Sequence, residues 1–173
     1  MESLGASVLM KLGYVEEVVF QYGAYEVVGY GVELLSSASL PITALLLMVT
    51  GAVAYREYRK GRFGPVQFPR FAAAFVLAFL VGSKVLSPQY IIWLLPLVPL
   101  SARGVWGVLV SGLFLAICWM TTWFYLYHHD EIRRNLESSG TTVLLWRNVL
   151  LVMLWVCILS LPPRRSTQQL SRE

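Results

Sequence analysis

The stretch GVWGVLVSGLFLAICWMTTWFYLY, residues 104–127, contains no Asp, Glu, Lys or Arg and is apolar along most of its length. A helix that crosses the hydrocarbon core of a bilayer needs roughly 20 such residues. A second run of this kind, VLLWRNVLLVMLWVCILSL, covers residues 143–161 and is interrupted by Arg147. These two runs predict an all-α fold, namely a polytopic transmembrane helical bundle.

The composition of the whole chain supports this fold class. Of 173 residues, 57% are hydrophobic and 14% are charged, whereas an average soluble domain is about 25% charged. The net charge is +4, but the basic residues do not form one aromatic-interleaved face, so no nucleic acid is expected as a partner. Cys118 and Cys157 lie inside apolar runs without metal or redox spacing, so we expect small buried side chains.

We predict a transmembrane domain over residues 39–162, with a third segment that is short and broken by prolines. Pro41 is expected in the first turn of the first helix, where its missing N–H costs little. Residues 1–38 are expected to be extracytoplasmic or interfacial, with a short helix followed by a hairpin or an irregular segment. Residues 163–173 form a predicted cytoplasmic tail. The predicted membrane segments are about 40–55, 71–86, 90–102, 104–127 and 143–161.

Lys and Arg in short loops predict the orientation of the bundle. Residues 56–70 contain five of them, so we expect this loop in the cytoplasm. If every segment crosses, Arg103 and the C-terminus are also cytoplasmic, and the SPQY turn at 87–90 faces outward. The alternative, in which 90–102 dips into the membrane and returns, leaves more positive charges on the outer side.

The preferred orientation places residues 1–38 outside the membrane with no upstream segment to carry them there. We therefore expect the chain to be the C-terminal part of a longer protein. The start at Met1 is compatible with an internal methionine or a split gene.

Polar residues interrupt the apolar stretch KVLSPQYIIWLLPL, residues 84–97. The lysine is expected near the outer end of the second segment, where it either snorkels to the interface or binds an anion. The proline disfavours helix at the preceding serine, and the amide and phenol behind it supply hydrogen-bonding groups. An ordinary interfacial turn with an aromatic anchor is the alternative. The candidate binding residues are Lys84, Ser87, Gln89 and Tyr90.

The pattern Lys-Val-x-Ser-Pro-Gln-Tyr-x-x-Trp-x-x-Pro, which matches residues 84–96, resembles a motif of the polytopic C-type-fold glycosyltransferases. The resemblance is closest to family 87, the polyprenol-phosphate-mannose-dependent mannosyltransferases. The segment ESLGAS at 2–7 is similar to an Ile-Glu-Ser-x-x-Ala segment found upstream in the same proteins. The resemblance implies transfer of a sugar, with mannose expected, from a polyprenyl- or dolichyl-phosphate donor to an extracytoplasmic acceptor.

The resemblance also implies roles for individual residues. Lys84 would neutralise the donor phosphate, Gln89 and Tyr90 would orient it, and Glu2 with Ser3 would help to position donor or acceptor. The catalytic base of such enzymes is usually an acidic residue after the first membrane span, and that part has no counterpart in this chain. A missing N-terminal half or a partner chain would then supply the base, whereas a non-enzymatic transporter-like or assembly subunit is the alternative.

Other polar groups are weaker candidates. Adjacent residues on a helix do not share a face, so the HHDE sequence at 128–131 is expected to end a helix rather than to bind a metal, although use of a divalent ion is left open. Asp130 is expected to cap a short outer helix. Arg133 and Arg134 are candidates to face lipid or substrate phosphates, and Arg147 is expected to snorkel outward.

Overall fold

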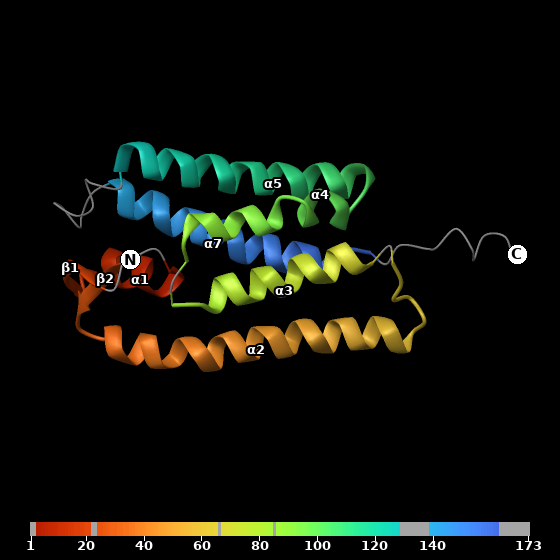
Figure 1. Ribbon diagram of the computed structural model, residues 1–173, viewed down its shortest axis with the longest axis horizontal. Helices are drawn as coiled ribbons and strands as arrows, with labels where there is room; N and C mark the ends of the chain where they lie inside the picture. The colour runs from red at the N-terminus through yellow and green to blue at the C-terminus, as the bar shows by residue number, and fades with distance from the viewer. Residues whose placement is uncertain (1–2, 22–23, 66, 85, 129–138, 163–173) are drawn as a thin grey trace, which may run out of the picture.

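Helical segments that run alternately in opposite directions form the body of the protein (Figure 1). The computed structural model describes residues 3–21, 24–65, 67–84, 86–128 and 139–162. The fold is all-α apart from one small two-stranded sheet, as the composition predicts. The long segments are α2 (Val32–Arg59), α3 (Phe68–Gly82), η1 (Pro88–Leu94) with α4 (Leu97–Ser101), α5 (Gly104–Trp123) with the π-helical η2 (Phe124–His128), and α7 (Ser139–Ser160).

The two ends of the bundle differ in what they contain. The hairpin end is the end with the N-terminal elements, the connection from α3 to η1 and the start of α7 (Figure 1). The basic end is the opposite one, with the connection from α2 to α3 and the turn between α4 and α5.

The N-terminal elements are a short helix and a β-hairpin. Helix α1 spans Leu4–Lys11, and strands β1 (Val15–Gln21) and β2 (Ala24–Gly29) pair antiparallel. A register shift lies between Val15 and Glu17. A side chain at Gly29 would collide with the carbonyl oxygen of Tyr14. The close approach of the two backbones at the end of β2 therefore requires glycine. The Val-rich sequence thus forms a hairpin, one of the two alternatives predicted for it.

Helix α2 begins earlier than we predicted. It starts at Val32 rather than near residue 40, and Pro41 lies inside it instead of in its first turn. Pro41 has no N–H, so the carbonyl of Ser37, four residues earlier, loses its helical donor. The Ser37 and Ser39 hydroxyls donate to other carbonyls of this region, those of Leu34 at 2.8 Å and Ser36 at 2.7 Å.

Helix α3 ends earlier than we predicted. Its last residue is Gly82, and Ser83 is extended with a ψ of 143°, whereas the prediction continued the helix to residue 86. A Cβ at Gly82 would lie 2.6 Å from the Cα of Thr43 on α2. The backbones of α2 and α3 therefore approach closely at the point where α3 stops, and the chain leaves the helix before Lys84.

The proline-broken segment forms two short helices in sequence. The 3₁₀ helix η1 is followed by α4, with Pro96 as the residue before α4. Both run on toward the basic end (Figure 1), and α5 then returns in the opposite direction. The segment does not fold back on itself. Such a path is the one expected if the segment crosses the membrane.

The main hydrophobic core lies between α3, η1–α4, α5 and α7. One fully or almost fully buried side chain from each of four elements illustrates it: Leu77, Leu94, Phe114 and Leu154. Helix α2 lies at the edge of the bundle and leaves large apolar side chains exposed. Three helices, Val32–Arg59, Gly104–Tyr127 and Ser139–Ser160, are long and apolar enough to cross a membrane, which fits exposed apolar surface facing lipid.

Candidate functional site

The sequence motif with Lys84 forms a non-helical connection at the hairpin end. Lys84 lies just beyond the end of α3 and its side chain is exposed, whereas we expected the helix to include it near its outer end. The cause is the stop of α3 at Gly82, because the residue that follows is already extended. Lys84 makes no hydrogen bond or ion pair with any residue that the structure describes, so its ammonium is available to a ligand.

The residues after the proline differ in exposure. Ser87 is half-buried and precedes η1, and its carbonyl accepts a hydrogen bond from the Tyr90 N–H at 3.0 Å. Gln89 is exposed, and it too forms no side-chain hydrogen bond within the described ranges. The Tyr90 ring is half-buried against the main core, with its centroid 5.0 Å from that of exposed Trp93. The motif thus combines two free polar groups with an aromatic pair anchored in the core.

The two candidate residues near the N-terminus have different outcomes. Glu2 lies outside the described residues. Ser3 is buried and caps α1, because its hydroxyl accepts a hydrogen bond from the Ala6 N–H at 3.2 Å. Such a cap stabilises a helix by about 1 kcal/mol. The structure therefore gives the Ser3 hydroxyl a local structural partner and does not bring it into contact with Lys84.

A buried polar seam joins α1 to α7, and the sequence reasoning missed it. Arg147 has an exposed fraction of 0%, so the expectation that it snorkels outward is wrong. Its Nε and Nη2 atoms donate to Asn148 Oδ1 at 3.2 and 2.8 Å, and Asn148 Nδ2 donates to Ser7 Oγ at 3.1 Å. We call Ser7, Arg147 and Asn148 the polar seam. Its one sequence signal is the Arg-Asn pair inside an otherwise apolar run.

A second contact fixes α1 on the start of α7. Lys11 Nζ donates to Thr142 Oγ1 at 2.9 Å, and Met10 packs with buried Leu144 in a small second core. Together with the polar seam, these contacts hold α1 along the first turns of α7. This arrangement forms a fixed N-terminal layer at the same end of the bundle as Lys84.

The connection with Lys84 and the polar seam adjoin a common core. Leu86, two residues after Lys84, belongs to the main hydrophobic core, and so does Leu151, which lies one helical turn after Arg147. Residues four apart stand above one another on a helix. The motif and the seam therefore both adjoin the main hydrophobic core.

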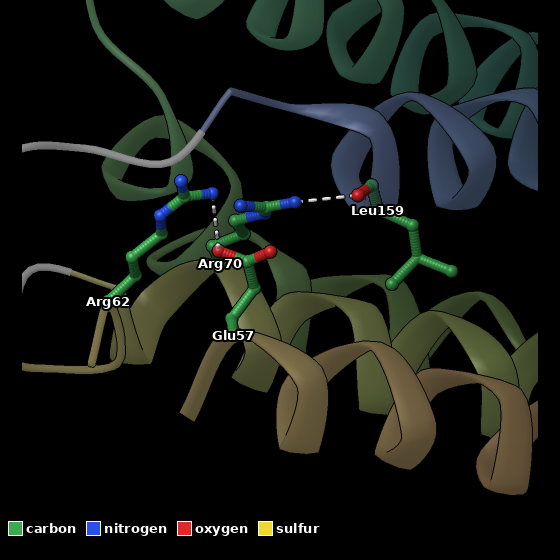
Figure 2. A network of polar contacts seen from close by, with 4 residues as sticks. All are labelled: Glu57, Arg62, Arg70 and Leu159. Atoms are coloured by element: carbon green, nitrogen blue, oxygen red, sulfur yellow. Dashed lines mark hydrogen bonds and ion pairs between the residues drawn. The ribbon is translucent and has the colours of Figure 1, made fainter. Parts of the chain in front are cut away.

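A separate polar cluster lies at the basic end, as Figure 2 shows. Arg70 is 3% exposed, and its Nε and Nη2 atoms donate to the carbonyl oxygens of Ile158 and Leu159 at 2.9 and 2.6 Å. The last carbonyls of a helix have no partner within it, so Arg70 caps the C-terminal end of α7. Beside it, an Arg62 nitrogen lies 3.9 Å from a Glu57 oxygen.

Several predicted candidates lie where the structure gives no account. Asp130, Arg133 and Arg134 are outside the described residues, and for His128 only the helical backbone is described. Within the described ranges, no group of three or more His, Cys, Asp or Glu side chains has the arrangement to hold a metal ion.

Comparison of the chain with protein-family models, with curated proteins and with solved structures finds no match. The residues at the hairpin end and the motif in their sequence are therefore the features from which a function can be inferred.

Proposed function

We propose that this membrane protein binds a polyprenyl- or dolichyl-phosphate sugar at its hairpin end, as the donor-binding part of a C-type-fold glycosyltransferase. The observation that supports this most is the exposed Lys84 ammonium on a non-helical connection, followed five residues later by the exposed amide of Gln89. A positive charge with a nearby hydrogen-bond donor suits a phosphodiester. The same residues belong to the motif that resembles the mannosyltransferases, and mannose is therefore the expected sugar.

The proposed chemistry separates binding from proton transfer. Sugar transfer breaks the bond between the sugar carbon and the donor phosphate, which leaves with the electron pair, and forms a bond to an acceptor hydroxyl oxygen. The Lys84 ammonium would stabilise the negative charge on the departing phosphate, and Gln89 would donate a hydrogen bond to it. The hydroxyl proton would go to a carboxylate base, which we place on a part of the enzyme or a partner chain outside this sequence.

The aromatic pair suits the lipid part of such a donor. The Trp93 side chain is 51% exposed and the Tyr90 ring beside it is held by the core. A prenyl chain that descends from a phosphate at Lys84 would pass apolar and aromatic surface of this kind. The polar seam would support the site indirectly, because it holds α1 on α7 at the same end.

The proposed orientation places the hairpin end outside the cell membrane and the basic end in the cytoplasm. It depends on the basic residues between α2 and α3 and on Arg103. A Ser87→Cys variant and an Arg62→Cys variant, each with Cys118 and Cys157 replaced by Ser, test it. In intact cells a membrane-impermeant maleimide should label the first and spare the second, and the reverse pattern would contradict the orientation.

Donor binding is tested with the purified full chain in nanodiscs and a short-chain polyprenyl-phosphate mannose. The account expects saturable binding that Lys84→Gln weakens about tenfold or more, since hydrogen bonds to charged groups contribute about 1.5–3 kcal/mol. Lys84→Arg should keep most of the affinity because it keeps the charge. Arg59→Gln, which removes an exposed charge at the basic end, should have little effect.

Three outcomes would count against the proposal. Equal affinity of Lys84→Gln and the wild type would remove Lys84 from the site. Binding that does not distinguish the phosphate-linked sugar from an uncharged prenyl alcohol would show that only the apolar chain is recognised. Binding without transfer activity in the presence of any partner chain would favour a non-enzymatic subunit.

A further inference from the structure

The last turns of α2 present a group of cations that the proposed function does not use. Arg56, Arg59 and Lys60 are all exposed. Residues three and four apart lie on the same face of a helix, so the three groups project from one side of α2 where it ends. Within the part of the chain that the structure describes, none of them forms an ion pair.

The one carboxylate in this turn does not neutralise these cations. Glu57 has a side chain that is 14% exposed, and its Oε2 atom lies 3.9 Å from Arg62 Nη1 in the following connection. Figure 2 shows the Glu57 carboxylate beside Arg70, with the Arg62 guanidinium, whose side chain is 48% exposed, approaching it from the following connection. The positive charge of Arg56, Arg59 and Lys60 is therefore available to an external anion.

A second cation stands at the same end of the bundle. Arg103 precedes α5 in the turn after α4, and it is exposed. This turn and the connection after α2 both lie at the basic end (Figure 1). We call Arg56, Arg59, Lys60 and Arg103 the basic collar.

Exposed aromatic side chains accompany the collar. Tyr55 and Tyr58 on α2 are 59% and 66% exposed, and Trp106, one turn into α5, is 53% exposed. Tyrosine and tryptophan are enriched at the level of the lipid headgroups, where one part of the ring is in contact with apolar chains and the other with polar groups. Their position one turn or less from the cations indicates where the membrane surface meets the collar.

The hairpin end has the opposite character among the described residues. Glu16, Glu17, Glu26 and Glu33 are all exposed there and outnumber the two exposed lysines of that end, Lys11 and Lys84. An anionic surface would be repelled by that end and attracted by the collar. The charge separation along the bundle axis therefore favours contact of the collar alone with anionic headgroups.

We propose that the basic collar binds the headgroups of anionic phospholipids, with the flanking tyrosines and tryptophan at the headgroup level. The cations of such a segment near a membrane surface each add about fivefold to the affinity for anionic lipid at low salt. Arginine can also hold a phosphate with two parallel hydrogen bonds. This interaction needs neither the sugar donor nor Lys84, so its failure would leave the proposed function unaffected.

Native mass spectrometry of the purified full chain tests the proposal. The protein in detergent is titrated separately with phosphatidylglycerol and with phosphatidylcholine of the same acyl chains. The account expects tighter binding of phosphatidylglycerol, which weakens as ammonium acetate is raised because salt screens exposed charges. In Arg56→Gln/Arg59→Gln/Lys60→Gln the affinity should fall on the order of 100-fold, toward the value for phosphatidylcholine.

Two control variants separate a local site from overall charge. Lys11→Gln removes one cation at the hairpin end and should keep the preference for phosphatidylglycerol. The double variant Arg56→Lys/Arg59→Lys keeps the charge. Its affinity for phosphatidylglycerol should fall at most a few-fold, since an ammonium still attracts the phosphate. A preference that survives in the triple variant, or one that Lys11→Gln abolishes, would overturn the proposal. So would equal binding of the two lipids by the wild-type protein.

Discussion

The hairpin end and the basic end each contain one buried arginine and a group of exposed polar side chains, but they combine them differently. At the basic end, Arg70 satisfies the last carbonyls of α7, and the exposed cations stand apart on the end of α2. At the hairpin end, Arg147 and Asn148 tie a separate N-terminal helix to α7. The two buried arginines hold parts of the fold together, whereas Lys84 and the basic collar form no ion pair with any residue that the structure describes.

The largest expected effect is at the hairpin end, from breaking the polar seam. Asn148→Leu removes the acceptor of two Arg147 hydrogen bonds and the donor to Ser7. Hydrogen bonds to charged groups contribute about 1.5–3 kcal/mol, so we expect a loss of about 3 kcal/mol in unfolding free energy. Reversible unfolding in mixed micelles measures it. Trp146→Phe, at an exposed neighbouring position, is the control, and equal stability of the two variants would show that the seam does not stabilise the fold.

The matching change at the basic end is Arg70→Met, which keeps much of the side-chain volume. It leaves the carbonyls of Ile158 and Leu159 without the guanidinium, and we expect a loss of about 2 kcal/mol. Hydrogen exchange should rise in the last turn of α7 and stay unchanged at its start. Faster exchange at the start of α7 as well would mean that Arg70 acts on the whole helix rather than as its cap.

A smaller effect is expected where α3 meets α2. Gly82→Ala places a methyl group 2.6 Å from the Thr43 Cα, and overpacking of this kind costs roughly 1–3 kcal/mol. We expect a loss near the lower limit, about 1 kcal/mol, because Gly82 is the last residue of α3 and can shift. Gly112→Ala on α5, where nothing lies within 4 Å, should be neutral or slightly stabilising in the same unfolding assay. Equal effects would contradict the close approach of the two backbones.

The smallest effect on stability is expected for the exposed lysine of the motif. Lys84→Gln should change the unfolding free energy by less than about 0.5 kcal/mol, as is usual for surface positions. This result would sharpen the contrast with Arg147, since both residues are basic and lie at the same end. A loss as large as that of Asn148→Leu would instead place Lys84 in the folded core of the hairpin end.

The sequence was sufficient for the fold class and for most of the helical segments. An uncharged run such as 104–127 has few alternatives to a membrane helix, and the structure forms α5 and η2 there. Helix ends were harder to predict. Helix α3 stops at Gly82, inside an apolar run with no proline at that point, and α2 starts so early that Pro41 lies inside it. Asn148, which accepts hydrogen bonds from Arg147, donates one to Ser7, and these two residues are 141 positions apart in the chain. No local sequence pattern reveals a partner at such a distance.

The candidate site was predicted only in part. The motif residues were identified from their order, but the exposure of Lys84 follows from a helix end that hydropathy does not reveal. Ser3 fits the pattern of a substrate-binding serine equally well as that of a helix cap, because the same hydroxyl can accept a backbone hydrogen bond or donate to a ligand. Only the three-dimensional position of α1 separates the two.

Photo-crosslinking with a diazirine-bearing polyprenyl-phosphate mannose tests the central claim most directly. The full chain in nanodiscs is irradiated, digested and analysed by mass spectrometry, with unlabelled donor as competitor. The account predicts competed crosslinks concentrated between residues 83 and 93, and their loss in Lys84→Gln. Crosslinks that spread over the lipid-facing sides of α2 and α5 and are not reduced by the competitor would contradict it.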